Sequence, residues 1–273
     1  MKLKKQRIVL WVSIFFASLI AISYFLEFKE GFTDKKNKDK DANKDANTNI
    51  PKTIYMCDKT LEHIQKYSKN WGKINPDYKI KLYDNQMCKK FLLEEYSQLH
   101  LNIFDFIKDG PIKADFWRCC ILYKYGGVYV DADIEPLEPI SFIPEDVDFV
   151  TCLSQYSNHL FNPHFIMAKP NDTFLKKCID KYISFYDNNK IYTYWGWSIV
   201  TILDAIMETM HKKNVTKDGI YTIDDKKCLF LKEVYGKNYQ DNHCVYKSKR
   251  ILNNRYKNYD FEKHAFKQTE IEK

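Results

Sequence analysis

Four charged side chains in the middle of the chain have the types and spacing of a metal and phosphate site. Asp115 and Arg118 lie three residues apart in a stretch with helical periodicity, so their side chains would emerge on neighbouring parts of one helix. Asp131 and Asp133 follow a short apolar run and would point to one side of an extended strand. Two carboxylates facing one way repel each other unless a cation or donors lie between them. Such oxygen ligands favour Mg²⁺ or Mn²⁺, which often share their coordination sphere with substrate phosphates.

Taken separately, each of these pairs has a simpler interpretation. An Asp-x-Asp triplet usually marks a solvated turn or a helix cap. The Asp115–Arg118 spacing alone usually gives a surface ion pair that contributes a few tenths of a kcal/mol. The ordered combination of a helix, a glycine turn, a buried strand and two acids is what favours a metal–diphosphate site.

The elements that must position these residues are a helix, a tight turn and a short strand. Pro111 fits the first helical position, where its missing N–H removes no hydrogen bond. Gly126-Gly127 ends the helix, because glycine adopts backbone angles that a residue with a Cβ resists. Val128–Val130 then reads as a buried strand. In open α/β sheets the carboxyl ends of strands are where ligands bind. Apolar residues at helical spacing mark the buried helix face: Ile112, Phe116, Cys119 or Cys120, and Tyr123.

Strand and helix patterns alternate through the rest of the chain and predict an α/β fold with a mostly parallel sheet flanked by helices. After residue 220 the pattern weakens, and the end of the chain from Tyr256 is expected to fray. The expected strands are 50–56, 78–83, 147–153 and 164–168; the expected helices are 61–71, 87–96, 173–186 and 192–210, with a loop or helix at 101–108 and a Pro-kinked connection at 135–139.

The central motif resembles that of the DXD-containing sugar transferases of glycosyltransferase family 32. It reads Ala-Asp-x-x-Arg at 114–118 and Tyr-Gly-Gly-Val-Tyr-x-Asp-x-Asp at 125–133. Flanking segments at 50–55, 75–84 and 161–170 look like strands of the same family. The resemblance implies a GT-A-like (Rossmann-type) fold and a transferase that retains anomeric configuration. It also implies Mn²⁺ or Mg²⁺, a UDP- or GDP-sugar donor, and a glycan, glycoprotein or glycolipid acceptor.

The resemblance assigns roles to the four charged residues. Asp133 would bind the metal, and Asp131 would hold the donor's ribose or a metal-bound water. Asp115 would hydrogen-bond sugar hydroxyls, and Arg118 would contact sugar or phosphate. These four residues are the predicted catalytic group.

Four further residues complete the predicted site by resemblance. Tyr55 and Tyr129 would line the nucleotide pocket, and Asn162 would contact the donor. His243 would supply a further metal contact, with an ordinary surface histidine as the alternative. The aromatic cluster at 192–198 would either stack on a sugar or pack in the core.

The composition disfavours nucleic acid as a partner. The formal net charge is +7, but the lysines are scattered among acids and there is no arginine-rich helix. Eight cysteines show no C-x-x-C spacing, which disfavours zinc or thioredoxin chemistry. Disulfides are allowed if the domain is luminal, but their pairing cannot be read from sequence. Cys119 and Cys120 are expected to be small core residues.

The N-terminal region predicts a membrane anchor. Residues 1–7 form a basic cytoplasmic tail, and 8–26 form an uncharged apolar run long enough to span a bilayer. A cleaved signal peptide is the alternative, but no small-x-small cleavage site follows the run. Residues 27–49 are rich in Lys, Asp and Asn and read as a flexible stem. The catalytic domain, 50–273, would then face the lumen of a Golgi- or ER-like compartment, or the outside, in a single-pass type II membrane protein.

Two rival functions remain open at this point. A haloacid-dehalogenase-like phosphatase also ends a strand in Asp-x-Asp, but usually on its first strand and followed by Thr or Val, whereas Ile134-Glu135 follows here. An inactive sugar- or nucleotide-binding protein of the same fold is the non-enzymatic rival. Metal-dependent hydrolysis of a nucleotide-sugar would separate the transferase from both.

Overall fold

The computed structural model describes residues 49–155, 160–210, 215–236 and 241–254. The predicted cytoplasmic tail, the anchor at 8–26, most of the stem and the C-terminal end from Tyr256 lie outside these ranges. Within them, no helix combines the length and the apolar character needed to cross a membrane.

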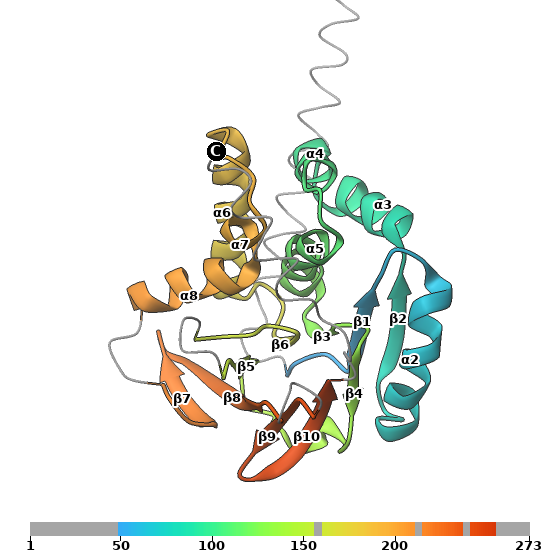
Figure 1. Cartoon of the computed structure of the whole chain (residues 1–273), viewed down its shortest axis with the longest axis vertical. Helices are drawn as coiled ribbons and strands as arrows, with labels where there is room; N and C mark the ends of the chain where they lie inside the picture. The colour runs from blue at the N-terminus through green and yellow to red at the C-terminus, as the bar shows by residue number, and fades with distance from the viewer. Residues whose placement is uncertain (1–48, 156–159, 211–214, 237–240, 255–273) are drawn as a thin grey trace, which may run out of the picture. The chain divides into compact units, whose positions relative to one another are not determined.

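Helices and strands alternate at first and strands dominate the C-terminal part (Figure 1). The helices are α2 (Leu61–Ile74), α3 (Asn85–Glu95), α4 (Gln98–Phe106), α5 (Gly110–Tyr125), α6 (Thr173–Asp187), α7 (Tyr194–Trp197) and α8 (Ile199–Met210), with a 3₁₀ turn at Ile140–Phe142. The strands are β1 (Thr53–Cys57), β2 (Lys79–Tyr83), β3 (Gly127–Val130), β4 (Ile134–Pro136), β5 (Phe149–Leu153), β6 (Phe165–Ala168), β7 (Gly219–Ile223), β8 (Lys226–Val234), β9 (His243–Tyr246) and β10 (Lys249–Asn254).

All ten described strands belong to one mixed sheet, in the order β2-β1-β3-β6-β5-β8-β9-β10-β4 with β7 beside β8. β1 pairs in parallel with β2 and β3, and β5 with β8; the other described pairs are antiparallel. The α/β class is confirmed, but the prediction of a mostly parallel sheet is wrong. Beyond residue 215 the chain forms hairpins, whose connections are too short for the crossover that a parallel pair needs.

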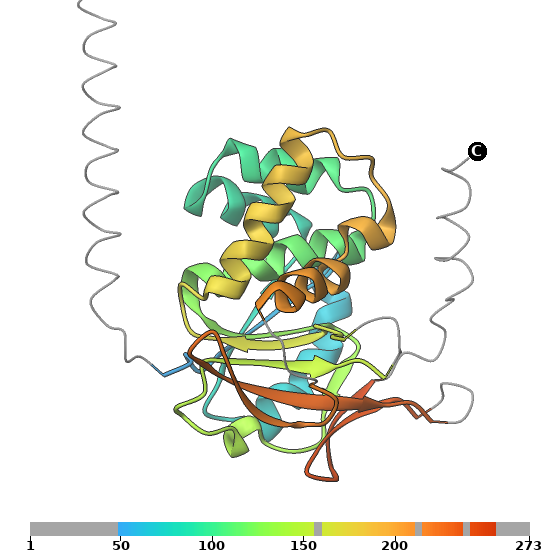
Figure 2. The ribbon, with the colours of Figure 1, turned by 90° about the vertical axis from the view of Figure 1, so that its left-hand side faces the viewer.

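The sheet is curled (Figure 2), and one turn links a strand near one end of the strand order to the strand at the other end. β3 lies third in the strand order, and β4 lies at the far end of it, paired with β10. Residues 131–133 alone connect β3 to β4 in the chain. The segment that carries the two predicted metal ligands therefore closes the curl, and the expected irregular connection at 135–139 begins instead with a short strand.

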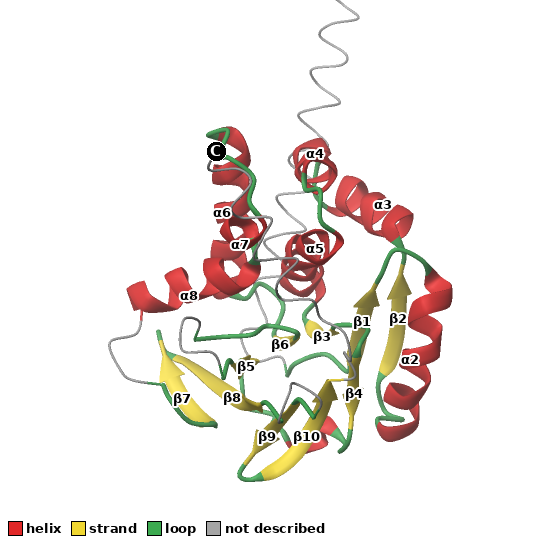
Figure 3. Ribbon diagram, in the orientation of Figure 1, coloured by secondary structure: helices red, strands yellow, loops and turns green. Residues whose placement is uncertain are grey.

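The sheet separates two apolar cores. Helices α3 to α8 cover one face, and α2 packs on the other beside β2 and β4 (Figure 3). Alternation along β3 shows the division: the Tyr129 side chain enters the first core, whereas Val128 and Val130 enter the second. In the second core the Trp71 indole stacks on Phe165 at 6.2 Å and donates to the Ile134 carbonyl at 2.9 Å. Helix α2 is thereby fixed against the residue that follows the turn.

The junction between α5 and β3 requires both of its glycines. Gly126 has φ 61° and Gly127 has φ 103°, a region that residues with a Cβ rarely adopt. A Cβ on Gly126 would lie 2.7 Å from the Pro170 ring, and one on Gly127 would lie 2.7 Å from the Thr53 carbonyl oxygen. The predicted glycine turn is confirmed. Helix α5 begins at Gly110, one residue earlier than the position of Pro111 predicted.

The predicted aromatic helix at 192–210 is divided into α7 and α8. Ser198 adopts an extended backbone, with ψ 140°, and its Oγ accepts a hydrogen bond from the Val200 amide at 3.3 Å. Ser198 thus ends one helix and begins the next. All eight cysteines lie within the described ranges and are free, and Cys119 and Cys120 are buried core residues as predicted.

Candidate active site

The two acids of the Asp-x-Asp motif lie in a turn. The Ile134 amide donates to the Asp131 carbonyl oxygen at 3.1 Å, which closes the turn directly after β3. Strand alternation was the predicted reason for the two carboxylates to face one side, and it does not apply here because β3 ends at Val130. The turn instead brings Asp131 and Asp133 to the wall of one cavity of about 810 Å³.

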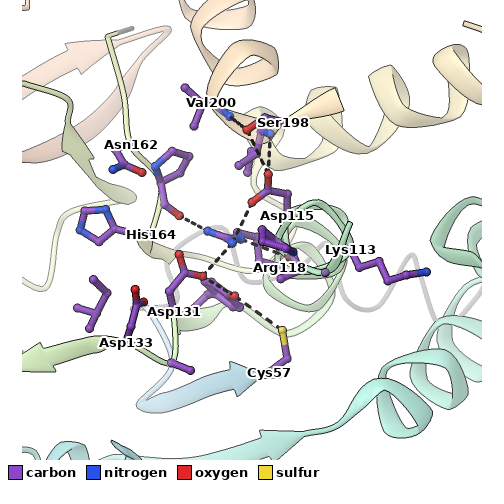
Figure 4. A pocket seen from close by; sticks show the side chains of 18 of the residues that line it. Cys57, Lys113, Asp115, Arg118, Asp131, Asp133, Asn162, His164, Ser198 and Val200 are labelled. Atoms are coloured by element: carbon purple, nitrogen blue, oxygen red, sulfur yellow. Dashed lines mark hydrogen bonds and ion pairs between the residues drawn. The ribbon is translucent and has the colours of Figure 1, made fainter. Parts of the chain in front are cut away.

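Arg118 joins helix α5 to this turn (Figure 4). Its Nη2 lies 2.9 Å from Asp131 Oδ1 and 2.9 Å from Asp115 Oδ1. Its Nη1 donates to the Pro163 carbonyl at 2.6 Å, and its guanidinium carbon lies 4.3 Å from the centre of the Tyr129 ring. Arg118 is only 3% exposed. The guanidinium is therefore engaged mainly with protein groups, and it orients the acids more directly than it could reach a donor.

Asp131 is held in one orientation by several donors. Its Oδ1 accepts from the Tyr129 hydroxyl at 2.8 Å in addition to Arg118, and its backbone amide donates to the His164 carbonyl at 2.9 Å. Within the described part of the chain, no hydrogen bond reaches its Oδ2. One oxygen of Asp131 is thus committed to the protein, and the other remains available to a ligand.

Asp115 is buried, and its second oxygen is bound by the junction of α7 and α8. Asp115 Oδ2 accepts from the Ser198 hydroxyl at 3.3 Å and from the Ile199 amide at 3.1 Å. This amide is free to donate because it lies at the start of α8, where helical amides lack partners. Burial raises the pKa of Asp115 from 3.8 to about 6, although Arg118 opposes the shift. Both oxygens of Asp115 already have protein partners. A sugar hydroxyl in the predicted contact would therefore have to bind an oxygen that also accepts from the protein.

The balance of charge at the turn favours a cation. Asp115 and Asp131 share one guanidinium, and burial followed by the charge of Asp131 raises the pKa of the nearby Asp133 to about 6. No hydrogen bond from another described residue reaches the Asp133 carboxylate. The Asn242 side chain also lines the cavity, and its Oδ1 is buried without a hydrogen-bond partner. These oxygens are the ligands that Mg²⁺ and Mn²⁺ prefer, so the residues fit the implied metal.

Basic side chains also line the cavity. Lys59 and Lys108 are exposed, and Lys113 is half-buried with its Nζ donating to the Phe104 carbonyl at 2.5 Å. Lys113 points away from Asp131 (Figure 4). Carboxylates and cationic side chains thus line the same cavity. Such a combination suits a diphosphate bound together with a metal ion.

Two other predicted donor contacts lie at the cavity. Tyr129 and Asn162 both line it. The Asn162 Nδ2 donates to Glu233 Oε1 at 2.7 Å, which leaves its Oδ1 as the atom for a ligand. The aromatic cluster divides between the two predicted roles: Trp197 is fully buried in the core, whereas Trp195 lines the cavity.

Tyr55 and His243 do not line this cavity. The Tyr55 ring is 3% exposed and packs 6.4 Å from the Tyr83 ring, beneath helix α5. His243 Nδ1 pairs with the Asp241 carbonyl oxygen at 2.9 Å. Asn242, directly before β9, lines the cavity, whereas His243, the first residue of β9, does not. Asn242, and not the predicted His243, is thus the residue of this pair that lines the cavity.

The hydrogen-bond partners of Asp115 and Asp131 that come from distant segments were not predicted from the sequence. Ser198 and Ile199 lie 83 and 84 residues beyond Asp115. His164 lies behind the turn, and its carbonyl accepts from Asp131. No local sequence pattern identifies these residues. The only indication is that a buried carboxylate such as Asp115 needs hydrogen-bond donors from somewhere in the fold.

The comparison with known proteins agrees with this geometry. Residues 62–150 match the family described as "Glycosyltransferase sugar-binding region containing DXD motif". The range includes Asp115, Arg118 and the turn of Asp131 and Asp133.

Three curated relatives match parts of the chain. The initiation-specific alpha-1,6-mannosyltransferase of Candida albicans is 35% identical over 77 residues, 28% of this chain and 20% of that protein. The mannosyl phosphorylinositol ceramide synthase SUR1 of Saccharomyces cerevisiae is 38% identical over 87 residues, 31% and 22% of the two chains. The human alpha-1,4-N-acetylglucosaminyltransferase is 33% identical over 119 residues, 43% and 30%. The match thus spans less than a third of each relative's length.

The family match includes several residues that line the cavity, among them Asp115, Asp131 and Asp133. Residues 62–150 are therefore similar to the sugar-binding region of the DXD-containing glycosyltransferases, and the resemblance inferred from the motif is confirmed.

Proposed function

We propose that the protein is a metal-dependent glycosyltransferase that moves a sugar from a nucleoside diphosphate to a glycan or glycolipid acceptor. The observation that carries the proposal is the turn at Asp131–Asp133. Its two carboxylates line a cavity of about 810 Å³, and one of them, Asp131, shares the Arg118 guanidinium with Asp115. The GT-A-like fold and retention of anomeric configuration, which the motif resemblance implies, form part of the proposal.

The chemistry follows from the leaving group. A nucleoside diphosphate departs with several negative charges, and a divalent cation held by Asp131 and Asp133 would supply the Lewis acid that offsets them. The remaining work falls to this chain's own residues. Arg118 and Tyr129 hold Asp131 Oδ1, so its Oδ2 keeps one direction. Lys59 and Lys108 at the cavity wall are placed to attract the anionic donor.

The donor sugar is the part of the proposal that the relatives leave open. Two of the relatives reported above are named for mannosyl transfer and one for N-acetylglucosaminyl transfer. We propose a UDP- or GDP-activated hexose or N-acetylhexosamine as the donor. Trp195 at the cavity wall offers an aromatic face on which a sugar ring could stack.

The deciding experiment is a screen of UDP- and GDP-sugars with the full-length chain, with Mn²⁺, Mg²⁺ or chelator present. We expect release of UDP or GDP from one donor class, dependent on the metal. An inactive binding protein would bind a donor with metal and release nothing. A phosphatase would release inorganic phosphate from simple phosphate esters. Either result would overturn the proposal.

We also propose that residues 8–26 anchor the protein as a single-pass type II membrane protein, with the catalytic domain luminal or extracytoplasmic. This rests on the apolar run and its basic flank alone. The expected results are resistance to carbonate extraction and protection of residues 49–254 from protease in sealed vesicles. Release of the chain by carbonate would contradict the anchor without affecting the transferase proposal.

A further inference from the structure

Behind the turn, the curled sheet encloses two thiols and an imidazole. Cys152 lies on β5, Cys244 on β9, and His164 directly before β6. All three side chains are buried, and their ligand-capable atoms lie within 4.8 Å of one another. The three residues are far apart in the chain, so the local cysteine spacing, which disfavoured zinc, carried no information about them.

The distances suit a tetrahedral thiophilic metal. His164 Nε2 lies 3.3 Å from Cys244 Sγ. Zinc bound by sulfur at about 2.3 Å and by nitrogen at about 2.1 Å would hold these two atoms about 3.6 Å apart. The observed distance between Nε2 and Sγ is therefore within a few tenths of an ångström of the distance expected for two ligands of a tetrahedral zinc ion.

The other ring nitrogen of His164 faces a carboxylate. Nδ1 lies 3.4 Å from Glu233 Oε1 and forms no aligned hydrogen bond. Glu233 is itself fixed by the Asn162 amide at 2.7 Å and the Tyr235 hydroxyl at 2.8 Å. Metal-binding histidines commonly direct their second nitrogen at a carboxylate, which keeps the proton there and leaves the first nitrogen for the metal.

The chemistry of the buried thiols also fits a metal. A thiolate is the form of cysteine that binds metals. All three groups are too deeply buried for the cluster to meet a macromolecular or bulky substrate, so catalysis by a cysteine nucleophile is not favoured.

We propose that Cys152, Cys244 and His164 bind a zinc ion at a second metal site, distinct from the turn of Asp131 and Asp133 and independent of the proposed transferase activity. Three protein ligands leave a fourth position for a water molecule, which can reach His164 because this residue also lines the cavity. The ion would fasten β9 to β5 and β6 across β8. It would thereby fix His164, whose carbonyl holds the Asp131 amide.

The test measures metal in the full-length chain. Protein loaded with zinc and then washed with a weak chelator is expected to retain close to one zinc ion per chain. Cys152→Ser and Cys244→Ser should lose it, and Glu233→Gln should weaken zinc affinity by about 10- to 100-fold. Cys228→Ala removes an equally buried thiol outside the cluster and should retain the zinc. Asp133→Asn should also retain it, which separates this site from the one at the turn.

A second measurement does not depend on variants that fold. Cobalt added to the metal-free wild-type chain is expected to give thiolate-to-metal charge-transfer absorption and the visible bands of a tetrahedral site. Three results would overturn the proposal. They are an absence of zinc and of these bands when the thiols are shown to be reduced, undiminished zinc in both cysteine variants, or a Cys152–Cys244 disulfide in peptides from the unreduced protein.

Discussion

Arg118 Nη2 lies 2.9 Å from Asp131 Oδ1, and this contact ties helix α5 to the turn that closes the curled sheet. The same nitrogen lies 2.9 Å from Asp115 Oδ1. One buried guanidinium therefore neutralises two carboxylates from different elements. Removing it leaves both acids without a counterion, and this makes Arg118 structural as well as functional.

Arg118→Ala is expected to lower the unfolding free energy by about 3–5 kcal/mol, because breaking a buried ion pair leaves an uncompensated charge. Urea unfolding of the full-length variant measures the change. Arg250→Ala is the matched control, since Arg250 also binds a carboxylate with two nitrogens but is half exposed. It should cause little measurable change. Equal losses in the two variants would contradict the role assigned to Arg118.

Asp133→Asn is expected to leave the chain folded and to abolish metal-dependent donor hydrolysis, because no hydrogen bond from another described residue reaches the Asp133 carboxylate. Water-proton relaxation in a Mn²⁺ titration measures binding at the turn directly. Asp180→Asn, at an exposed acid paired with Lys176 on α6, is the control and should bind Mn²⁺ like the wild type. Wild-type Mn²⁺ affinity in Asp133→Asn would remove this residue from the metal site.

The raised pKa of Asp115 predicts that the metal-free protein loses stability as the pH rises. The folded chain binds a proton that the unfolded chain has released between pH 3.8 and about 6, so the unfolding free energy falls over that interval by up to about 3 kcal/mol. Asp115→Asn should remove this component. Asp133, whose pKa is also raised to about 6, contributes in the same direction in both proteins, and His164 stays protonated in the folded chain over this interval. A wild type and variant with the same pH slope in urea unfolding would exclude this origin.

The parts of the site that sequence could predict are those built within one short segment. The i to i+3 spacing of Asp115 and Arg118, the proline at the helix start and the paired glycines all act locally, and the unit of α5 and β3 appears at its predicted place. The structure of the turn could not be predicted in this way, because the residue types of Asp131 and Asp133 do not show whether the strand continues through them. Asp131 and Asp133 share a cavity through a closed turn, which alternation along a strand did not anticipate.

The parts that could not be predicted depend on strand register and on distant contacts. The C-terminal hairpins β8 to β10 carry weak alternation, so nothing in the sequence showed whether Asn242 or His243 would face the cavity. The Ser198 and Ile199 donors to Asp115 exist only because α7 and α8 are separated at Ser198. The cluster of Cys152, His164 and Cys244 is likewise assembled by the curl of the sheet.

Two tryptophans two residues apart should respond differently to substitution. Trp197 is fully buried among Phe106, Tyr182 and Phe185, so Trp197→Ala is expected to cost about 3–5 kcal/mol of stability. Trp195 is half-buried and lines the cavity, so Trp195→Ala should lower turnover with a smaller loss of stability. Paired measurements of urea unfolding and donor hydrolysis test this. A larger loss of stability in Trp195→Ala than in Trp197→Ala would reverse the assignment.

Gly126→Ala is expected to destabilise the protein and to lower activity together, because the helix–strand junction sets the start of β3 and hence the position of the turn. The alanine Cβ would meet the Pro170 ring at 2.7 Å and the Pro51 ring at 2.9 Å, in a backbone conformation that itself costs on the order of 1–3 kcal/mol. Gly110→Ala at the other end of α5 is the control. Its Cβ would meet nothing within 4 Å, and the substitution should be neutral or stabilise by up to about 1 kcal/mol. Because the two changes are chemically identical and lie at the two ends of one helix, a similar melting temperature for both variants would show that the junction does not constrain the site.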